Sequence, residues 1–172
     1  ISKIEAGELT LLETEVDVAE AIETSIALGS SQISVAGLSL STHIDENLPF
    51  LLADKTRIEQ ILNNLISNAV KFTPTGGEVS IQATLNGNND FILSVADNGI
   101  GIREEDLPKI MMPFEQVENI MTRTHEGSGL GLPLVKHLVE AQDGTLKIDS
   151  QIDKGTTVTI TFPNERTAPF NA

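Results

Sequence analysis

Three polar side chains at helical spacing are the residues of this chain best suited to chemistry. Asn64, Asn68 and Lys71 lie four and three residues apart, so on a helix they share one face. Amide oxygens suit a hard cation such as Mg²⁺, and a lysine ammonium binds phosphate as a point charge. The pattern predicts a platform for a metal and phosphates. The alternative is a set of solvated polar positions, because short motifs are weak evidence alone.

A helix that presents this face must be anchored on its other side. Asp54 is a suitable N-cap, and Pro74 with the glycines after it stops the helix near Thr73. A stripe suited to a hydrophobic core lies opposite the polar face and consists of Ile58, Ile61, Leu65, Ala69 and Phe72.

A first glycine-rich motif, residues 97–102, follows a predicted strand. Asp97 at the strand tip could accept a hydrogen bond from an exocyclic amine. Gly99 and Gly101 would let the backbone approach a flat ring. The alternative is a simple turn at the strand end, because Asn-Gly is a frequent turn dipeptide.

A second glycine-rich motif runs directly into a predicted helix. Gly127, Gly129 and Gly131 would expose backbone N–H groups where the helix dipole favours an anion. The alternative is a flexible hinge with a glycine N-cap. The motif does not open a βαβ unit as a Rossmann glycine loop does, and it lacks the Gly-Lys-Ser/Thr of a Walker loop.

Composition excludes several classes of function. With 11 basic and 25 acidic residues the chain carries a formal charge of −14, which argues against a nucleic-acid binder and against an electrostatic membrane anchor. Without cysteine it has no disulfide, zinc-thiolate site or cysteine nucleophile. Its apolar runs are shorter than a membrane span. Any bound polyanion must be met by local groups and a metal.

The remaining pattern predicts strands and helices in an order typical of a layered α+β domain with an antiparallel-rich sheet. Residues 111–127 are expected to form a mobile loop, and residues from 164 onward a tail. The strands are expected at 9–18, 38–44, 51–53, 78–85, 91–97, 145–148 and 156–162, and the helical segments at 1–6, 19–29, 54–73, 104–110 and 130–141.

Taken together and in this order, the motifs resemble the ATP-binding catalytic domain of two-component sensor histidine kinases, within the gyrase, Hsp90, histidine kinase and MutL superfamily. The resemblance covers about residues 13–163 and includes an N box at 57–73, glycine boxes at 97–102 and 126–132, an F box at 113–115 and a closing strand motif at 154–158.

This resemblance implies a two-layer α/β sandwich of the Bergerat type, with a mixed sheet packed against three helices and a mobile ATP lid. Residues 1–7 resemble the last turn of a preceding dimerisation helix. The expected organisation is a helix remnant and linker at 1–12, the catalytic domain at 13–165, and a tail at 166–172.

The resemblance also implies roles for individual residues toward Mg²⁺ and ATP. Asn68 would hold Mg²⁺ with Asn64 assisting, and Lys71 would contact phosphate oxygens. Asp97 would recognise the adenine amine, and Thr156 would place an adenine-bound water. The other nucleotide contacts would come from Gly99, Gly101 beneath the ring, Phe114 as anchor of the lid, Arg123, and the second glycine box with Gly127, Gly129, Leu130 and Gly131.

One position distinguishes members of this superfamily. Hydrolytic members carry a glutamate base four residues before the Mg²⁺ asparagine, and this chain has Asn64 there. An amide does not accept a proton at neutral pH, so transfer to a separately presented nucleophile is favoured. None of His43, His125 and His137 stands in the expected acceptor motif. The acceptor is therefore expected on a dimerisation domain absent from this chain.

The expected activity is histidine kinase phosphotransfer within two-component signalling, with no autophosphorylation by the isolated domain. A nucleotide-binding scaffold or pseudokinase and a hydrolytic ATPase are the alternatives. The implied partners are the dimerisation and phosphoacceptor domain of the same protein and a response regulator, and nucleic acid is not among them. The parent is expected to be a homodimer that carries this domain in the cytoplasm, whether membrane-anchored or soluble.

Overall fold

The centre of the domain is a five-stranded mixed sheet in the order β2-β4-β5-β7-β6. The computed structural model describes residues 10–113 and 131–168. Strand β2 runs parallel to β4, and the other neighbouring pairs are antiparallel. The strands span Ser39–Ile44 (β2), Glu78–Leu85 (β4), Phe91–Asp97 (β5), Thr145–Gln151 (β6) and Gly155–Phe162 (β7).

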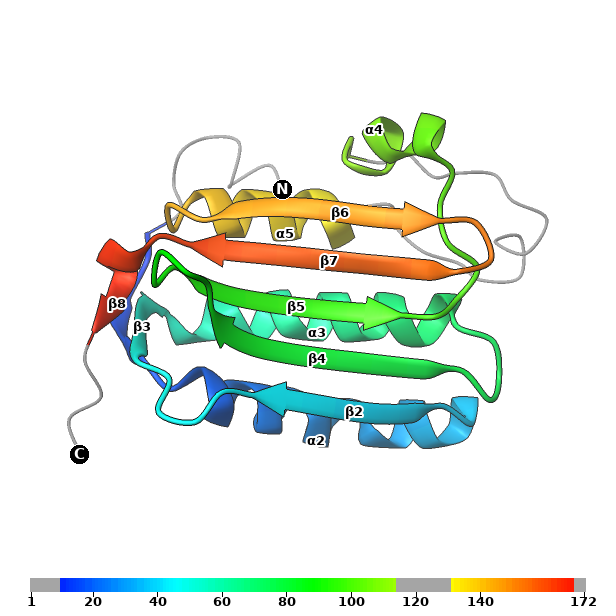
Figure 1. Cartoon of the computed structure of the whole chain (residues 1–172), viewed down its shortest axis with the longest axis horizontal. Coiled ribbons are helices and arrows are strands. Elements are labelled where there is room, and N and C mark those ends of the chain that lie inside the picture. The colour runs from blue at the N-terminus through cyan, green and yellow to red at the C-terminus, as the bar shows by residue number, and fades with distance from the viewer. Residues whose placement is uncertain (1–9, 114–130, 169–172) are drawn as a thin grey trace.

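Helices cover one face of this sheet, as Figure 1 shows. They are α2 (Val18–Ala36), α3 (Lys55–Phe72) and α5 (Gly131–Glu140), with α3 packed between the other two. Residues that alternate along the strands meet the apolar stripes of the helices in one core. The two-layer α+β architecture predicted from the sequence is confirmed.

The central helix α3 has the bounds that its sequence signals predict. The Asp54 carboxylate accepts a hydrogen bond from the N–H of Arg57, and Thr73 follows as the C-cap. Ile58, Ile61, Leu65 and Ala69 are buried as expected, and Phe72 at the end is half-buried. The polar face is thus fixed in orientation by the packing of the opposite one.

Helix α2 is longer at both ends than predicted. It begins at Val18, where the sequence suggested strand, because the Asp17 carboxylate caps it by accepting from the N–H of Glu20. It also continues through Gly29, which was expected to end it. A Cβ at Gly29 would lie 3.4 Å from a methyl of Ile66 on α3, an ordinary van der Waals distance, so Gly29 lies on the side of α2 that faces α3. The helix ends instead at Gly37, with φ of 68°.

A second, three-stranded sheet was not predicted. It has the order β1-β3-β8, formed by Glu13–Val16, Phe50–Asp54 and Thr167–Ala168. The expectation of a tail from residue 164 onward is wrong for residues 164–168, because the 3-10 turn Asn164–Arg166 leads into β8, which pairs with β3. A two-residue strand is too short to give an alternating pattern in the sequence.

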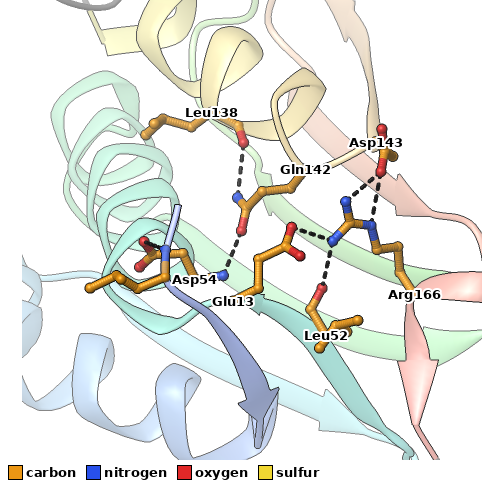
Figure 2. A network of polar contacts seen from close by, with 8 residues as sticks. Glu13, Leu52, Asp54, Leu138, Gln142, Asp143 and Arg166 are labelled. Carbon is orange, nitrogen blue, oxygen red and sulfur yellow. Dashed lines mark hydrogen bonds and ion pairs between the residues drawn. The ribbon is translucent and has the colours of Figure 1, made fainter. Parts of the chain in front are cut away.

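A network of polar contacts, which we call the Arg166 clamp, fastens this small sheet to the end of α5 (Figure 2). The Arg166 guanidinium donates to the carboxylates of Glu13 and Asp143 and to the Leu52 carbonyl. These contacts join the first strand, the last turn before β8 and the loop after α5.

Beside the clamp, Gln142 is fully buried and satisfied at both ends. Its amide oxygen accepts from the N–H of Asp54 at 2.8 Å, and its amide nitrogen donates to the Leu138 carbonyl at 2.9 Å. Because a buried amide without partners is costly, this pairing ties the start of α3 to the end of α5.

The remaining described elements are a 3-10 turn, Glu104–Asp106, and the short helix α4, Leu107–Ile110, which agree with the helical segment predicted at 104–110. In the described part of the chain, no helix combines the length and apolar character needed to cross a bilayer.

Candidate functional site

The polar face of α3 meets the first residue of α5. A Cβ built on Gly131 would lie 3.4 Å from Oδ1 of Asn64 and 3.6 Å from the side-chain nitrogen of Asn68. Both amides predicted to act together therefore lie beside the beginning of α5. A side chain at Gly131 would contact both amides, so the glycine keeps them uncovered on this side.

The Asn64 amide is oriented by its own helix. Its nitrogen donates to the Gln60 carbonyl at 2.8 Å, so its oxygen is the atom left on the side of Gly131. A neutral oxygen acceptor here, with the Asn68 amide one turn on, fits a hard cation that also takes phosphate and water oxygens. The donor set of these two residues is therefore compatible with Mg²⁺.

Lys71 lies at the end of the same helix. Its ammonium nitrogen is 5.0 Å from the centroid of the Phe72 ring. The Phe72 carbonyl accepts a hydrogen bond from the N–H of Ile100 at 3.1 Å, which brings the loop after β5 against the end of α3. Asn64, Asn68 and Lys71 therefore follow one another along α3, and the loop of the first glycine motif packs against the C-terminal end of this helix.

Asp97 ends β5 on the side of the sheet that faces the helices. It is paired with the buried Val79 on one neighbouring strand and with Thr156 on the other. Its carboxylate accepts from the N–H of Gly99 at 2.8 Å and from the backbone N–H of Thr156. Burial raises the pKa of Asp97 above its ordinary 3.8, and these two hydrogen bonds lower it in part.

The glycines of the first motif have a packing reason to be glycine. A Cβ on Gly99 would lie 2.2 Å from the Phe72 carbonyl oxygen. A Cβ on Gly101, at φ of 66°, would lie 2.0 Å from the carbonyl oxygen of Gln151. Backbone therefore packs directly on backbone, and contact of these glycines with a flat ring stays a prediction.

Ser150 is a candidate site residue that the sequence did not indicate. It pairs with Thr156 across β6 and β7, and the two hydroxyl oxygens are 2.8 Å apart. Asp97, Thr156 and Ser150 thus form one polar row across three strands. The predicted strand at 145–148 stopped short of Ser150, whereas β6 continues to Gln151. The alternation of polar and apolar residues in this strand could have been extended beyond Lys147, and this was the available signal for a longer strand.

Part of the predicted site lies outside the described residues. The F box residue and the lid and glycine-box positions on this part of the chain are Phe114, Arg123, Gly127, Gly129 and Leu130.

The described groups are suited to a ligand with two different ends. Asp97 offers a partly desolvated acceptor for an amine, and the Asn64 and Asn68 amides offer a place for a cation and the anion it bridges. A nucleotide with a divalent cation has this combination.

Replacing Asp97 by asparagine should change how stability depends on pH. A raised native pKa means that the folded state holds the proton more tightly, so this group's stabilisation is greatest below the ordinary 3.8 and is lost as pH rises through the raised value. We therefore expect Asp97→Asn to gain stability relative to wild type over that window. Urea unfolding of both proteins between about pH 4 and about pH 7 measures it, and a pH-independent difference would contradict the assignment.

Comparison with known proteins identifies the family of this chain. Residues 53–166 match the model of the family described as "Histidine kinase-, DNA gyrase B-, and HSP90-like ATPase". The chain is 41% identical over 166 residues to the non-motile and phage-resistance protein of Caulobacter vibrioides, covering 95% of this chain and 20% of that protein. It is 38% identical over 174 residues to the cell-division control histidine kinase PdhS of Brucella abortus, covering 96% of this chain and 17% of that protein.

Solved structures give the same result. Full-length ShkA in complex with AMPPNP superposes with a TM-score of 0.85 at 28% identity, covering 98% of this chain and 34% of that chain. The nucleotide-free catalytic domain of histidine kinase ThkA superposes with a TM-score of 0.77 at 26% identity, covering 88% of this chain and 95% of that chain. The chain therefore belongs to the histidine kinase-, DNA gyrase B- and HSP90-like ATPase family, and within it to the catalytic domains of the two-component histidine kinases.

Proposed function

We propose that this domain binds Mg²⁺-ATP and donates the γ-phosphoryl group to a histidine on a dimerisation domain. The proposal rests on one observation. The Asn64 and Asn68 amides of α3 lie beside Gly131 of α5, and the C-terminal end of α3 contacts the loop that follows Asp97. The chain spans 17% to 20% of the two curated relatives described above, so the activity of a whole parent protein is part of the proposal.

At the base end, Asp97 would accept a hydrogen bond from the adenine amine. Its carboxylate is held by two backbone N–H groups, of Gly99 and Thr156, so it is aimed before the ligand arrives. Gly101 would lie beneath the ring, and Thr156 would act beside Asp97. A preformed acceptor loses little entropy on binding, which favours affinity.

At the phosphate end, Asn68 would hold Mg²⁺ with Asn64 assisting. When bound, the ion neutralises charge on the transferring phosphoryl group. Lys71 would pair with phosphate oxygens, and the N–H groups of Gly127, Gly129, Leu130 and Gly131 would surround them. Phe114 and Arg123 are proposed to act from the lid, Phe114 as its anchor and Arg123 as a further phosphate contact.

The acceptor is proposed to be a histidine presented by a separate dimerisation domain, with a response regulator receiving the phosphoryl group next. Asn64 occupies the place of a hydrolytic base and cannot take a proton from water at neutral pH. The work of this domain is then positioning and charge stabilisation, while the nucleophile comes from outside.

A mixing experiment tests the proposal. The chain is incubated with Mg²⁺-ATP labelled at the γ position, alone and with the dimerisation domain of its parent. We expect acid-labile label on the dimerisation domain and none on this chain. Binding of ATP without any such transfer would contradict phosphotransfer and favour a nucleotide-binding scaffold. Steady release of phosphate by the chain alone would favour a hydrolytic ATPase.

Asn64→Glu should raise ATP hydrolysis by the isolated domain, because it supplies a carboxylate base at the position where hydrolytic relatives have one. General base catalysis contributes about 100- to 10,000-fold where geometry is right, so even a tenfold gain is informative. Phosphate release measures it, with Asn64→Gln as the matched uncharged control. An unchanged rate would indicate that the position of the water, and not the base, limits hydrolysis.

We also propose a revised boundary for the catalytic domain. The sequence suggested residues 13–165, but β8 pairs with β3 and Arg166 contacts Glu13. Residues 166–168 are therefore proposed to belong to the folded unit, and residues 1–12 to a dimerisation helix and linker.

A further inference from the structure

The Ser150 hydroxyl has three hydrogen-bond partners, which together use its one proton and both of its lone pairs. Its oxygen accepts from the N–H of Ile102 at 2.8 Å, is 3.0 Å from the carbonyl oxygen of Gly155, and is 2.8 Å from the hydroxyl oxygen of Thr156. A serine hydroxyl has one proton and two lone pairs. The Ile102 N–H occupies one lone pair, which leaves one proton and one lone pair for the other two partners.

The Gly155 carbonyl decides how these are used, because it can only accept. When Ser150 gives its proton to Gly155, the remaining lone pair accepts the proton of Thr156. The Thr156 oxygen is then left with lone pairs and no proton for a ligand. This arrangement satisfies Ile102, Gly155 and Thr156 together, whereas a Ser150 proton aimed at Thr156 leaves the Gly155 carbonyl without this donor.

Thr156 is the direct neighbour of Asp97 in the row across the sheet, and its backbone N–H donates to that carboxylate. With the Thr156 hydroxyl turned toward Ser150, both side chains at this position accept hydrogen bonds. In direct contact, two neighbouring acceptors favour a ligand edge that presents N–H donors to them and disfavour a carbonyl oxygen at that place.

We propose that Ser150 is a positioning residue that fixes Thr156 as an acceptor and thereby sets selectivity for a 6-amino purine over a 6-oxo purine. The inference rests on the proposed function, because it places the base beside Asp97. Loss of the Ser150 hydroxyl frees Thr156 to rotate and donate, so a 6-oxo base is accepted more easily.

The matched ligands are ATP and ITP, which differ at position 6 and in the proton on the adjacent ring nitrogen. Calorimetric titration with Mg²⁺ gives the affinity of each for wild type, Ser150→Ala, Thr156→Val and the double variant. We expect Ser150→Ala to lower the ATP to ITP affinity ratio about 3- to 10-fold, the range of one neutral hydrogen bond. Thr156→Val should lower the ratio similarly, and adding Ser150→Ala to it should change the ratio no further.

The double variant separates positioning from a structural role. Ser150 also supplies the acceptor for Ile102, and that contribution would weaken binding of both nucleotides alike and would persist without the Thr156 hydroxyl. Thr157→Val, on the same strand but the opposite face, is the control and should keep the wild-type ratio. If Ser150→Ala does not fold, Ser150→Thr and Ser150→Val form an isosteric pair, of which only the threonine should retain selectivity.

An unchanged ratio in Ser150→Ala, or a further drop when Ser150→Ala is added to Thr156→Val, would overturn the inference while leaving nucleotide binding intact. Absence of binding of either nucleotide by the wild-type chain would overturn the proposed function and this inference with it.

Discussion

Gly155→Ala should unfold the domain or destabilise it by about 3 kcal/mol or more, the combined cost of a left-handed residue and an overpacked contact. A Cβ at this position would lie 1.9 Å from the carbonyl oxygen of Asp97 and 2.7 Å from the Cα of Asn98, at a φ of 106°. The colliding atoms are backbone, so no side-chain rotation relieves the contact. Because Asp97 is one of them, nucleotide affinity should fall as well.

Gly76→Ala is the matched control, because Gly76 has φ of 85° and no atom within 4 Å of the added Cβ. The free energy of unfolding should fall by about 1–2 kcal/mol in this variant, because the left-handed backbone conformation is strained but no added atom collides. Urea unfolding of both variants and wild type measures the difference. Equal destabilisation by the two substitutions would contradict the close approach of β7 to the end of β5.

Asn68→Ala should lower the affinity for Mg²⁺-ATP about 10- to 150-fold while leaving the fold unchanged. The substitution removes an amide beside Gly131, and interactions with charged groups contribute about 1.5–3 kcal/mol each. Asn68 is half-buried on the polar face of α3, so its loss leaves the packed face of the helix untouched. Titration calorimetry with and without Mg²⁺ measures the effect, and the loss should be greatest when Mg²⁺ is present.

Asn63→Ala is the control for this experiment. It is the same chemical change on the same helix, five residues earlier and so on a different face. Its affinity for Mg²⁺-ATP should match wild type. Retention of full affinity in Asn68→Ala, or an equal loss in Asn63→Ala, would remove Asn68 from the proposed metal site.

The sequence predicts those elements whose ends carry their own signals. Helix α3 has a capping aspartate and a terminal proline, and β4 and β5 flank an Asn-Gly turn, so their bounds agree with the structure. Helix α2 was predicted to end at Gly29, but it continues to Ala36 along its contact with α3. Contacts between segments distant in the chain are not encoded in local periodicity.

The same distinction applies to the site. Asn64, Asn68 and Asp97 could be proposed as site residues because each sits in a motif with a fixed spacing, and the structure places the asparagines beside Gly131. Ser150 could not, since its role depends on the register between β6 and β7 and on the loop at Ile102. Register is a property of the assembled sheet, so a lone serine near a turn carries no such signal.

The Arg166 clamp has a consequence for the kinetics of folding. Glu13 and Arg166 are 153 positions apart, and the nearby Asp54 and Gln142 are 88 apart. Closing such long loops costs chain entropy before any contact is gained, whereas the β4–β5 hairpin closes locally. The clamp is therefore expected to close after the folding transition state. The stabilisation that the Arg166 clamp provides then lowers the unfolding rate and leaves the refolding rate almost unchanged.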